Sequence, residues 1–134
     1  MSSALARLGD LLDEVTAAGI SPERIVWTGF SQGACLAAEF VARRAQRYGG
    51  VLLFSGGLIG PPETPRAYEG QLAGTPVFLG CSDRDAHIPV ARVEETAEVL
   101  TRLGAVVDRR IYPRMGHTIN DDEIAAAAAL VAAV

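Results

Sequence analysis

Two short, almost uninterrupted apolar runs constrain the fold of this chain more than any other feature. Residues 51–54 (VLLF) and 76–79 (PVFL) contain no charged or polar side chain. Runs of this kind are typical of strands in a parallel sheet whose two faces are both covered. Parallel strands are joined by crossover connections, which are usually helices, so the chain must also supply helices.

Helical and strand-like segments alternate along the rest of the chain. Leucines recur at helical spacing from Leu5 onward and the pattern stops at Gly19, which predicts a first helix. The pattern further predicts strands at 25–28 and 106–112, and helices at about 32–47, at 90–103 and from Asp121 onward. We therefore expect an α/β fold with about four parallel strands flanked by helices, a truncated α/β-hydrolase domain spanning residues 1–134.

Composition excludes several classes of function. Twelve basic residues stand against 16 acidic ones, for a net charge of −4, and this charge gives no field that would hold a nucleic acid or an anionic membrane. Two cysteines are too few for a disulfide framework and fit a reducing compartment. The sequence has neither a signal peptide pattern nor 18 consecutive apolar residues. We expect a cytoplasmic protein with no nucleic-acid or membrane partner.

A GxSxG motif lies where a predicted strand turns into a predicted helix, at residues 29–33 (GFSQG). This setting is that of a nucleophile elbow, in which Ser31 is held in a strained conformation at the carboxyl edge of the sheet. We expect Gly29 and Gly33 to be required because the turn is too tight for side chains beside the serine. The plainer interpretation of Ser31 is a residue that caps the following helix.

A serine nucleophile needs a histidine base and an orienting carboxylate. Of the two histidines, His117 lies between the predicted fourth strand and the last helix, where the order Ser, acid, His of an α/β-hydrolase would place the base. The acid should follow the third strand, where Asp83 and Asp85 are both available. His87 is interpreted as a structural histidine or one at the rim of the site.

Four motifs in order resemble the bacterial phospholipase/carboxylesterase family related to acyl-protein thioesterases, within the α/β-hydrolase superfamily. They are GFSQG at 29–33, FSGG at 54–57, DAHIP at 85–89 and MGH at 115–117. The resemblance implies that Asp85 is the catalytic acid, because the family's acid lies four positions before the proline of this segment. Asp83 is then expected to accept hydrogen bonds that stabilise the loop.

The resemblance also implies an incomplete oxyanion hole. Family members carry further strands before the helix that opens this chain, and a loop among them donates one of two oxyanion N–H groups. In this sequence only the amide of Gln32 is expected to serve, and losing one donor typically costs roughly 10² to 10³ in rate. The strand at 25–28 is expected to form an exposed apolar edge, which leads us to expect a homodimer or higher homo-oligomer.

Other interpretations remain open for several polar residues. Asp83, Asp85 and His87 could form a metal cluster, although the triad explains Asp85 better. Cys81 follows a strand near the expected site and could react with thiol reagents, whereas Cys35 is expected in the core. Trp27, Phe54 and Phe78 are expected to be core residues, and 121–123 to be an acidic helix start.

Together these features predict a serine carboxylesterase acting on small uncharged esters through Ser31, His117 and Asp85, with no metal or organic cofactor. Leu58, Ile59 and Ile88 are expected to form an apolar wall for the substrate. The alternatives are a weak or inactive hydrolase fold that acts as a binding module, and a self-assembling subunit that uses its exposed strand edge.

Overall fold

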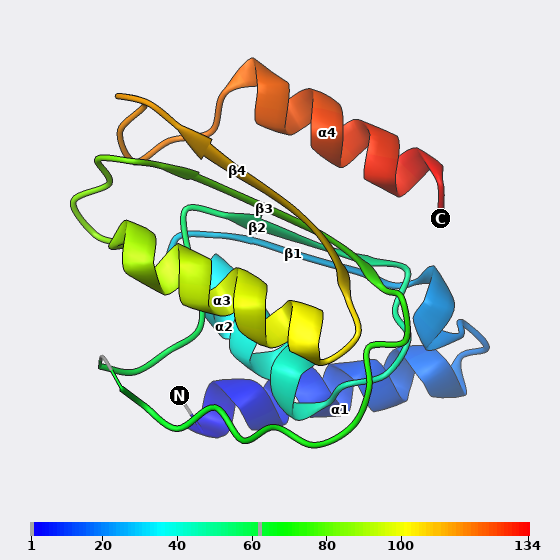
Figure 1. Cartoon of the computed structure of the whole chain (residues 1–134). Coiled ribbons are helices and arrows are strands. Elements are labelled where there is room, and N and C mark those ends of the chain that lie inside the picture. The colour runs from blue at the N-terminus through cyan, green and yellow to red at the C-terminus, as the bar shows by residue number, and fades with distance from the viewer. Residues whose placement is uncertain (1, 62) are drawn as a thin grey trace.

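A four-stranded parallel sheet forms the centre of the molecule. The computed structural model describes residues 2–61 and 63–134. The strands are β1 (Val26–Phe30), β2 (Gly50–Phe54), β3 (Pro76–Ser82) and β4 (Val106–Tyr112), and they lie in the order β1-β2-β3-β4 (Figure 1). The predicted α/β fold with four parallel strands is confirmed, and the carboxyl ends of all four strands meet at one edge.

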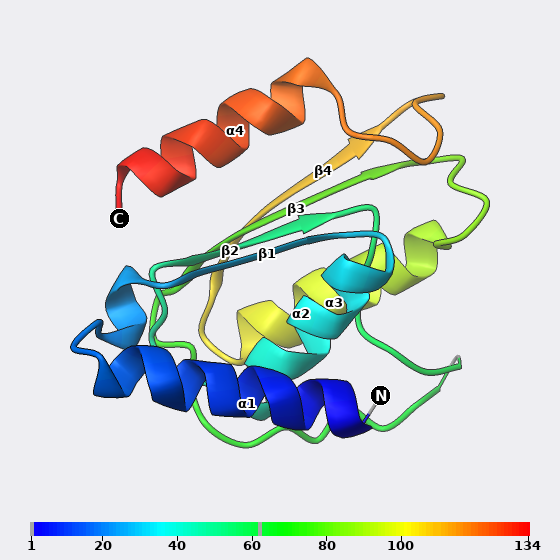
Figure 2. The same ribbon diagram turned by 180° about the vertical axis from the view of Figure 1, so that it is seen from behind.

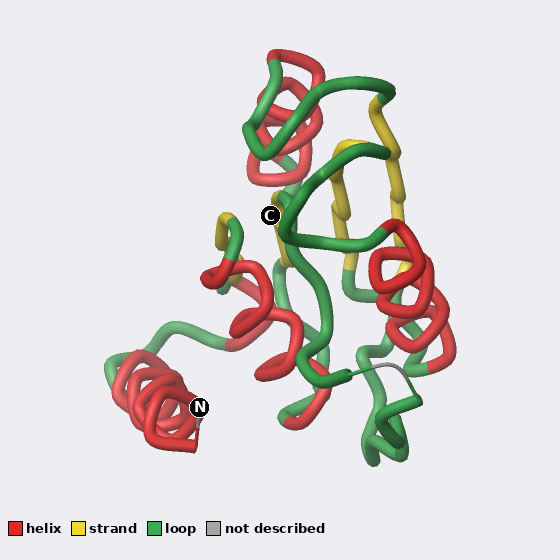
Figure 3. Tube along the Cα trace, turned by 90° about the vertical axis from the view of Figure 1, so that its left-hand side faces the viewer, coloured by secondary structure: helices red, strands yellow, loops and turns green. Residues whose placement is uncertain are grey.

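Helices cover the two faces of the sheet unequally. The main helices are α1 (Ser2–Ala17), α2 (Gln32–Arg43), α3 (Val90–Arg102) and α4 (Asp121–Ala132), with a short 3-10 helix η1 (Pro22–Arg24) before β1. In Figure 1, α2 and α3 lie below the sheet and α4 lies alone above it. The reverse view places α1 beside α2, on the side away from α4 (Figure 2). A view turned by 90° shows α1 standing apart from the strands (Figure 3).

The core reflects this unequal cover. The larger cluster of buried apolar residues joins α2, α3 and the inner strands, and it includes Phe40, Leu53 and Leu100. Under α4 the buried cluster among the described residues is only Leu52, Phe54 and Phe78. Phe54 and Phe78 are therefore core residues, as predicted.

Trp27 is half-buried on the larger side of the sheet. Its ring packs against Phe40 and Tyr48, with centroid separations of 4.7 and 5.9 Å. The indole N–H is buried and has no hydrogen-bond partner among the described residues. Trp27 thus packs against the core, as predicted, but it is only half-buried.

The second helix is shorter than its sequence pattern predicts. It ends at Arg43, because the chain then leaves the helical path and the backbone of Ala45 bridges to Gly70. Arg47, expected within the helix, lies beyond it and donates a hydrogen bond to the carbonyl of Gly74. Long-range pairing thus overrides local helix propensity here.

Both ends of the sheet are open edges in the described part of the chain. β1 pairs only with β2, as expected from the sequence, and its residues are half-buried or exposed. None of the described helices is long and apolar enough to cross a membrane.

Candidate active site

Ser31 lies at a strained turn between β1 and α2. Its backbone has φ 58° and ψ −118°, a conformation that non-glycine residues rarely adopt and that clusters at functional sites. The turn is tight at Gly29, where a Cβ atom would lie 2.3 Å from the backbone of Gly33. The expected steric need for Gly33 itself is wrong for the described residues, because a Cβ atom there would meet nothing within 4 Å.

The hydroxyl of Ser31 faces a histidine and does not cap the helix. Ser31 precedes α2 but makes no side-chain capping hydrogen bond. Its Oγ lies 2.8 Å from Nε2 of His117, 86 positions along the chain, in the loop between β4 and α4. The geometry is that of a hydroxyl whose proton can pass to an imidazole.

The other ring nitrogen of His117 contacts Asp85, in the loop after β3. Nδ1 of His117 lies 2.5 Å from Oδ2 of Asp85, whose side chain is fully buried. Oδ1 of Asp85 accepts hydrogen bonds from the amides of His87 and Ile88 at 2.7 and 3.2 Å. The structure therefore brings together all three residues of the predicted triad, and Asp85 holds the His117 tautomer that leaves Nε2 free to face the serine.

Hydrogen bonding keeps Asp85 ionised despite its position. Burial acts to raise the pKa of this carboxyl, but the hydrogen bonds from His117, His87 and Ile88, together with the His117 charge, outweigh burial and lower the pKa below its ordinary value. The carboxylate is therefore negatively charged at neutral pH, so it can stabilise an imidazolium at His117.

Cys81 lies beneath the acid and is not accessible. Its side chain is fully buried, and Sγ lies 3.9 Å from Oδ2 of Asp85 as a weak donor. Burial, followed by the charge of Asp85, raises the pKa of the Cys81 thiol to about 12. The expectation that Cys81 could react with thiol reagents is wrong for the folded chain, because reagents cannot reach it and it stays protonated.

Two rings flank the imidazole of His117. The ring of Phe30 lies 4.9 Å away and that of His87 lies 4.6 Å away, measured between centroids. Phe30 is 42% exposed, so an apolar surface opens beside the serine and histidine. His87 is exposed at the rim of the site.

Asp83 accepts a hydrogen bond within the loop region and does not contact the imidazole. Its Oδ1 accepts from the amide of Arg114 at 2.9 Å, which ties the acid loop to the histidine loop. In the described part of the chain, no group of three or more His, Cys, Asp or Glu residues could hold a metal ion. The carboxylates of the metal alternative are instead engaged by backbone amides and by His117.

Gln32 is the first residue of α2. Amides in the first turn of a helix have no intrahelical partner and can bind a negatively charged group placed before the helix.

The loop after β2 approaches the turn at Ser31 closely at Gly56, where a Cβ atom would lie 2.7 Å from the carbonyl oxygen of Ser31. The need for glycine at position 56 comes from a long-range contact and was not predicted.

The three residues expected to line the substrate occupy different places. Leu58 is 1% exposed and belongs to the core, where it leaves no surface for a ligand. Ile59 borders a hollow lined also by Glu39, Arg66 and Tyr68, and the described residues that line it do not include the triad. Of the three, only Ile88 lies at the site, where its backbone N–H donates a hydrogen bond to Asp85.

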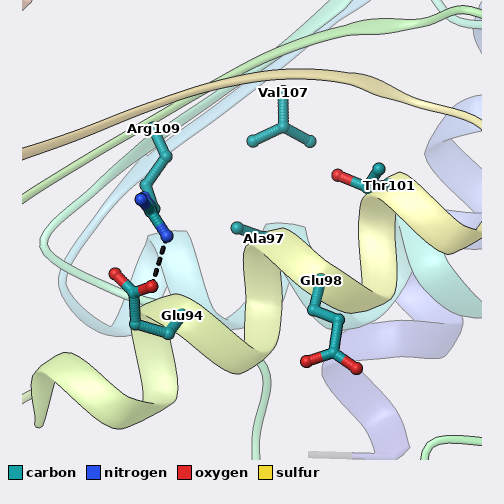
Figure 4. A pocket seen from close by; sticks show the side chains of 6 residues that line it. All are labelled: Glu94, Ala97, Glu98, Thr101, Val107 and Arg109. Carbon is teal, nitrogen blue, oxygen red and sulfur yellow. Dashed lines mark hydrogen bonds and ion pairs between the residues drawn. The ribbon is translucent and has the colours of Figure 1, made fainter.

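A further hollow lies between α3 and β4, away from the triad. Arg109 extends from β4 toward Glu94 of α3 and forms an ion pair with it (Figure 4). The other lining residues are Ala97, Glu98, Thr101 and Val107. Among the described lining residues, the Arg109 guanidinium is already paired with Glu94, and none belongs to the triad.

The sequence did not single out Ser82, although it joins both loops of the site. Its buried hydroxyl accepts hydrogen bonds from the amides of Arg84 and Gly116. Nothing in the spacing of a single serine at a strand end could have indicated this role, because the donor at Gly116 is 34 positions away.

Comparisons with known proteins bear on this geometry. The profile of the Phospholipase/Carboxylesterase family matches residues 1–134. A probable carboxylesterase of Oryza sativa is 30% identical over 90% of this chain and 52% of its own length, and acyl-protein thioesterase 1 of Gibberella zeae is 31% identical over 86% and 50%. The chain thus spans about half the length of these relatives.

Among solved structures, a phospholipase/carboxylesterase from Dyadobacter fermentans superposes with a TM-score of 0.93 at 42% identity, covering 98% of this chain and 63% of that one. With its α/β-hydrolase fold and a family profile that matches along its whole length, the chain belongs to the phospholipase/carboxylesterase family.

Proposed function

We propose that the chain is a serine carboxylesterase that hydrolyses small uncharged esters through an acyl-enzyme. The observation that carries this proposal is the continuous line of contacts from Ser31 Oγ to His117 Nε2 and from His117 Nδ1 to Asp85, at 2.8 and 2.5 Å. A strained serine with a positive φ at the start of α2 supports the same role.

In the proposed reaction, Ser31 Oγ attacks the ester carbonyl carbon while His117 Nε2 takes its proton. The tetrahedral intermediate collapses when His117 returns this proton to the leaving alkoxide, which departs as an alcohol and leaves an acyl group on Ser31. Water then gives a proton to His117 and attacks the acyl carbon. The bond between Ser31 Oγ and this carbon breaks while His117 returns the proton to Oγ, which releases the carboxylic acid and restores Ser31. Asp85 stays ionised throughout and stabilises the imidazolium.

The amide of Gln32 is the proposed oxyanion donor. It belongs to the first turn of α2, next to the serine, where its N–H and the positive end of the helix favour developing negative charge.

The substrate wall is proposed to combine Ile88 with the exposed ring of Phe30. These surfaces are apolar, which favours esters without a charge near the carbonyl.

The test is hydrolysis of p-nitrophenyl acetate and butyrate by the purified chain. We expect the wild type to release p-nitrophenol above background and Ser31→Ala to fall to background. Ser21→Ala is the matched control, because Ser21 is exposed before η1 and makes no capping hydrogen bond. Equal rates for the wild type and Ser31→Ala would reject the esterase and leave the inactive binding module.

We also propose that two copies associate through β1. The strand has no partner on its outer side in the described chain, and a two-fold axis would bring the same strand of a second copy against it. Sedimentation should show a dimer at micromolar concentration that Thr28→Lys on β1 weakens. Val106→Lys, on the opposite edge and 66% exposed in the wild type, should leave it intact. A wild-type monomer would reject this proposal.

A reducing compartment such as the cytoplasm is proposed as the location. Cys35 and Cys81 are both free thiols in the structure, which supports this assignment.

A further inference from the structure

Ser82 connects the two loops that carry the acid and the histidine. It is the last residue of β3 and is fully buried. Its Oγ accepts a hydrogen bond from the amide of Arg84 at 3.0 Å and another from the amide of Gly116 at 3.1 Å. Arg84 directly precedes Asp85, and Gly116 directly precedes His117. One oxygen therefore holds the backbone next to both members of the ion pair.

A second connection lies beside the first but is more exposed. The amide of Asp83 donates to the carbonyl of Tyr112 at 2.9 Å, and Oδ1 of Asp83 accepts from the amide of Arg114 at 2.9 Å. Asp83 and Arg114 are both exposed, so water can replace the side-chain bond if it is lost. Water cannot reach the fully buried hydroxyl of Ser82 in the same way, so its two bonds are the harder ones to replace.

The histidine loop needs such support because its backbone is unusual. Arg114 and Gly116 both have positive φ, at 56° and 81°. Glycine adopts this region without strain, but Arg114 does not, and a strained residue of this kind persists only where surrounding contacts fix it. A serine hydroxyl has two acceptor lone pairs, and the amides of Arg84 and Gly116 use both. Alanine at position 82 would leave both amides without this partner.

We propose that Ser82 is a positioning residue that fixes the separation of Asp85 and His117, and through it the tautomer and orientation of the imidazole. The inference rests on the proposed esterase function, in which Ser82 touches neither substrate nor the reacting atoms. A displacement of catalytic groups by about 1 Å typically costs about 10²-fold in rate. The expected effect is therefore on kcat, with KM nearly unchanged.

The experiment compares Ser82→Ala with Thr75→Val. Thr75 is also fully buried, and its hydroxyl accepts from the amide of Tyr48 at 3.0 Å and donates to the carbonyl of Leu72. Thr75 lies just before β3, at the opposite end of that strand from the site. Both variants lose a buried hydroxyl, so both should lose stability. Only Ser82→Ala should lower kcat, by roughly 10- to 100-fold per folded molecule. Equal kcat in the two variants would overturn the proposal.

A spectroscopic measurement separates this proposal from the esterase itself. The Nδ1 proton of His117, bonded to Asp85, should give a low-field proton resonance in the wild type and in Thr75→Val, and a weakened or shifted one in Ser82→Ala. If the wild type proves inactive, the esterase fails while this comparison still decides the role of Ser82. An unchanged resonance in Ser82→Ala would reject the positioning role.

Hydrogen exchange on the wild type keeps the proposal testable if Ser82→Ala does not fold. The amide of Gly116, donating to a buried hydroxyl, should exchange slowly, as protected as the amides of β4 that are hydrogen-bonded to β3. Exchange at the rate of an unstructured loop would contradict a fixed connection through Ser82.

Discussion

At the scale of single residues, the site depends on groups that are kept in one protonation state by their surroundings. Hydrogen bonds from His117 and two backbone amides keep Asp85 ionised, whereas burial keeps the neighbouring Cys81 protonated. Two side chains whose nearest polar atoms lie 3.9 Å apart thus have pKa values shifted in opposite directions, that of Asp85 downward and that of Cys81 upward. The sequence identified Asp85 through its motif and placed Cys81 near the site, but it did not indicate that this thiol is buried, because burial depends on the packing of the whole sheet.

Thiol labelling tests this description of the cysteines. In the native chain we expect a disulfide reagent such as dithionitrobenzoate to modify Cys35, which is partly exposed, and to leave Cys81 unmodified until the chain unfolds. Burial and a pKa of about 12 are the reasons for the protection of Cys81. The control is Cys35→Ser, which should abolish labelling of the native protein. Rapid native labelling of Cys35→Ser would show that Cys81 is accessible.

Glu123 offers a test through pH. It is fully buried at the start of α4, where one carboxyl oxygen completes a capping box with Asn120 and the other has no partner among the described residues. Burial raises its pKa, and the charge of Asp122 adds to this despite the opposing hydrogen bond from the Asn120 amide. Its contribution to stability is therefore full below its ordinary pKa, near pH 4.5, and is lost as pH rises through the folded value.

Glu123→Gln removes this titration. The free energy of unfolding of Glu123→Gln relative to the wild type should increase between about pH 4 and about pH 7.5, measured by urea denaturation. Asp121→Asn, an exposed acidic residue of the same helix start, serves as the control and should show a flatter difference. If the free energy of unfolding of Glu123→Gln relative to the wild type stays constant or falls as pH rises, the ionised Glu123 side chain does not destabilise the folded chain.

At the scale of elements, the ion pairs of α2 and of α3 have very different burial. The described residues of the long loop after β2 form no helix or strand, and Glu39 of α2 holds this loop. The carboxylate of Glu39 accepts from Arg43, Arg66, Tyr68 and the amide of Ile59. Its side chain is 2% exposed and that of Arg66 is 6% exposed. The pair Arg109 and Glu94 between β4 and α3 is 44% exposed at both side chains.

These two pairs predict a large contrast in stability. Glu39→Gln should lower the free energy of unfolding by about 2 kcal/mol, because it removes one of the two carboxylates that pair with the buried guanidinium of Arg66 and leaves Glu95. Glu94→Gln should change it by less than about 1 kcal/mol, because exposed pairs contribute little. Urea denaturation of both variants gives the comparison. Equal losses would mean that the Glu39 network does not anchor the loop.

At the scale of the whole molecule, the sequence predicted the order of elements because each strand and helix has its own local pattern. The unbroken apolar run at 51–54 and the acidic start at Asp121 lie where β2 and α4 were expected. The predictions failed where distant segments meet. Leu58 lies in the core because its backbone forms hydrogen bonds with Thr96 and Arg92 on α3. The bridge between Ala45 and Gly70 ends α2 earlier than its sequence pattern predicts. Such contacts leave no periodic signal in the sequence.

The most direct test of the account is covalent labelling of Ser31 by a fluorophosphonate, read as a mass increase on the peptide that contains residue 31. The reagent needs an activated hydroxyl but no particular ester, so it tests the arrangement of Ser31, His117 and Asp85 itself. We predict stoichiometric labelling of Ser31 in the wild type, much slower labelling in Asp85→Asn and none in His117→Ala. Labelling of the wild type no faster than that of His117→Ala would contradict a working triad.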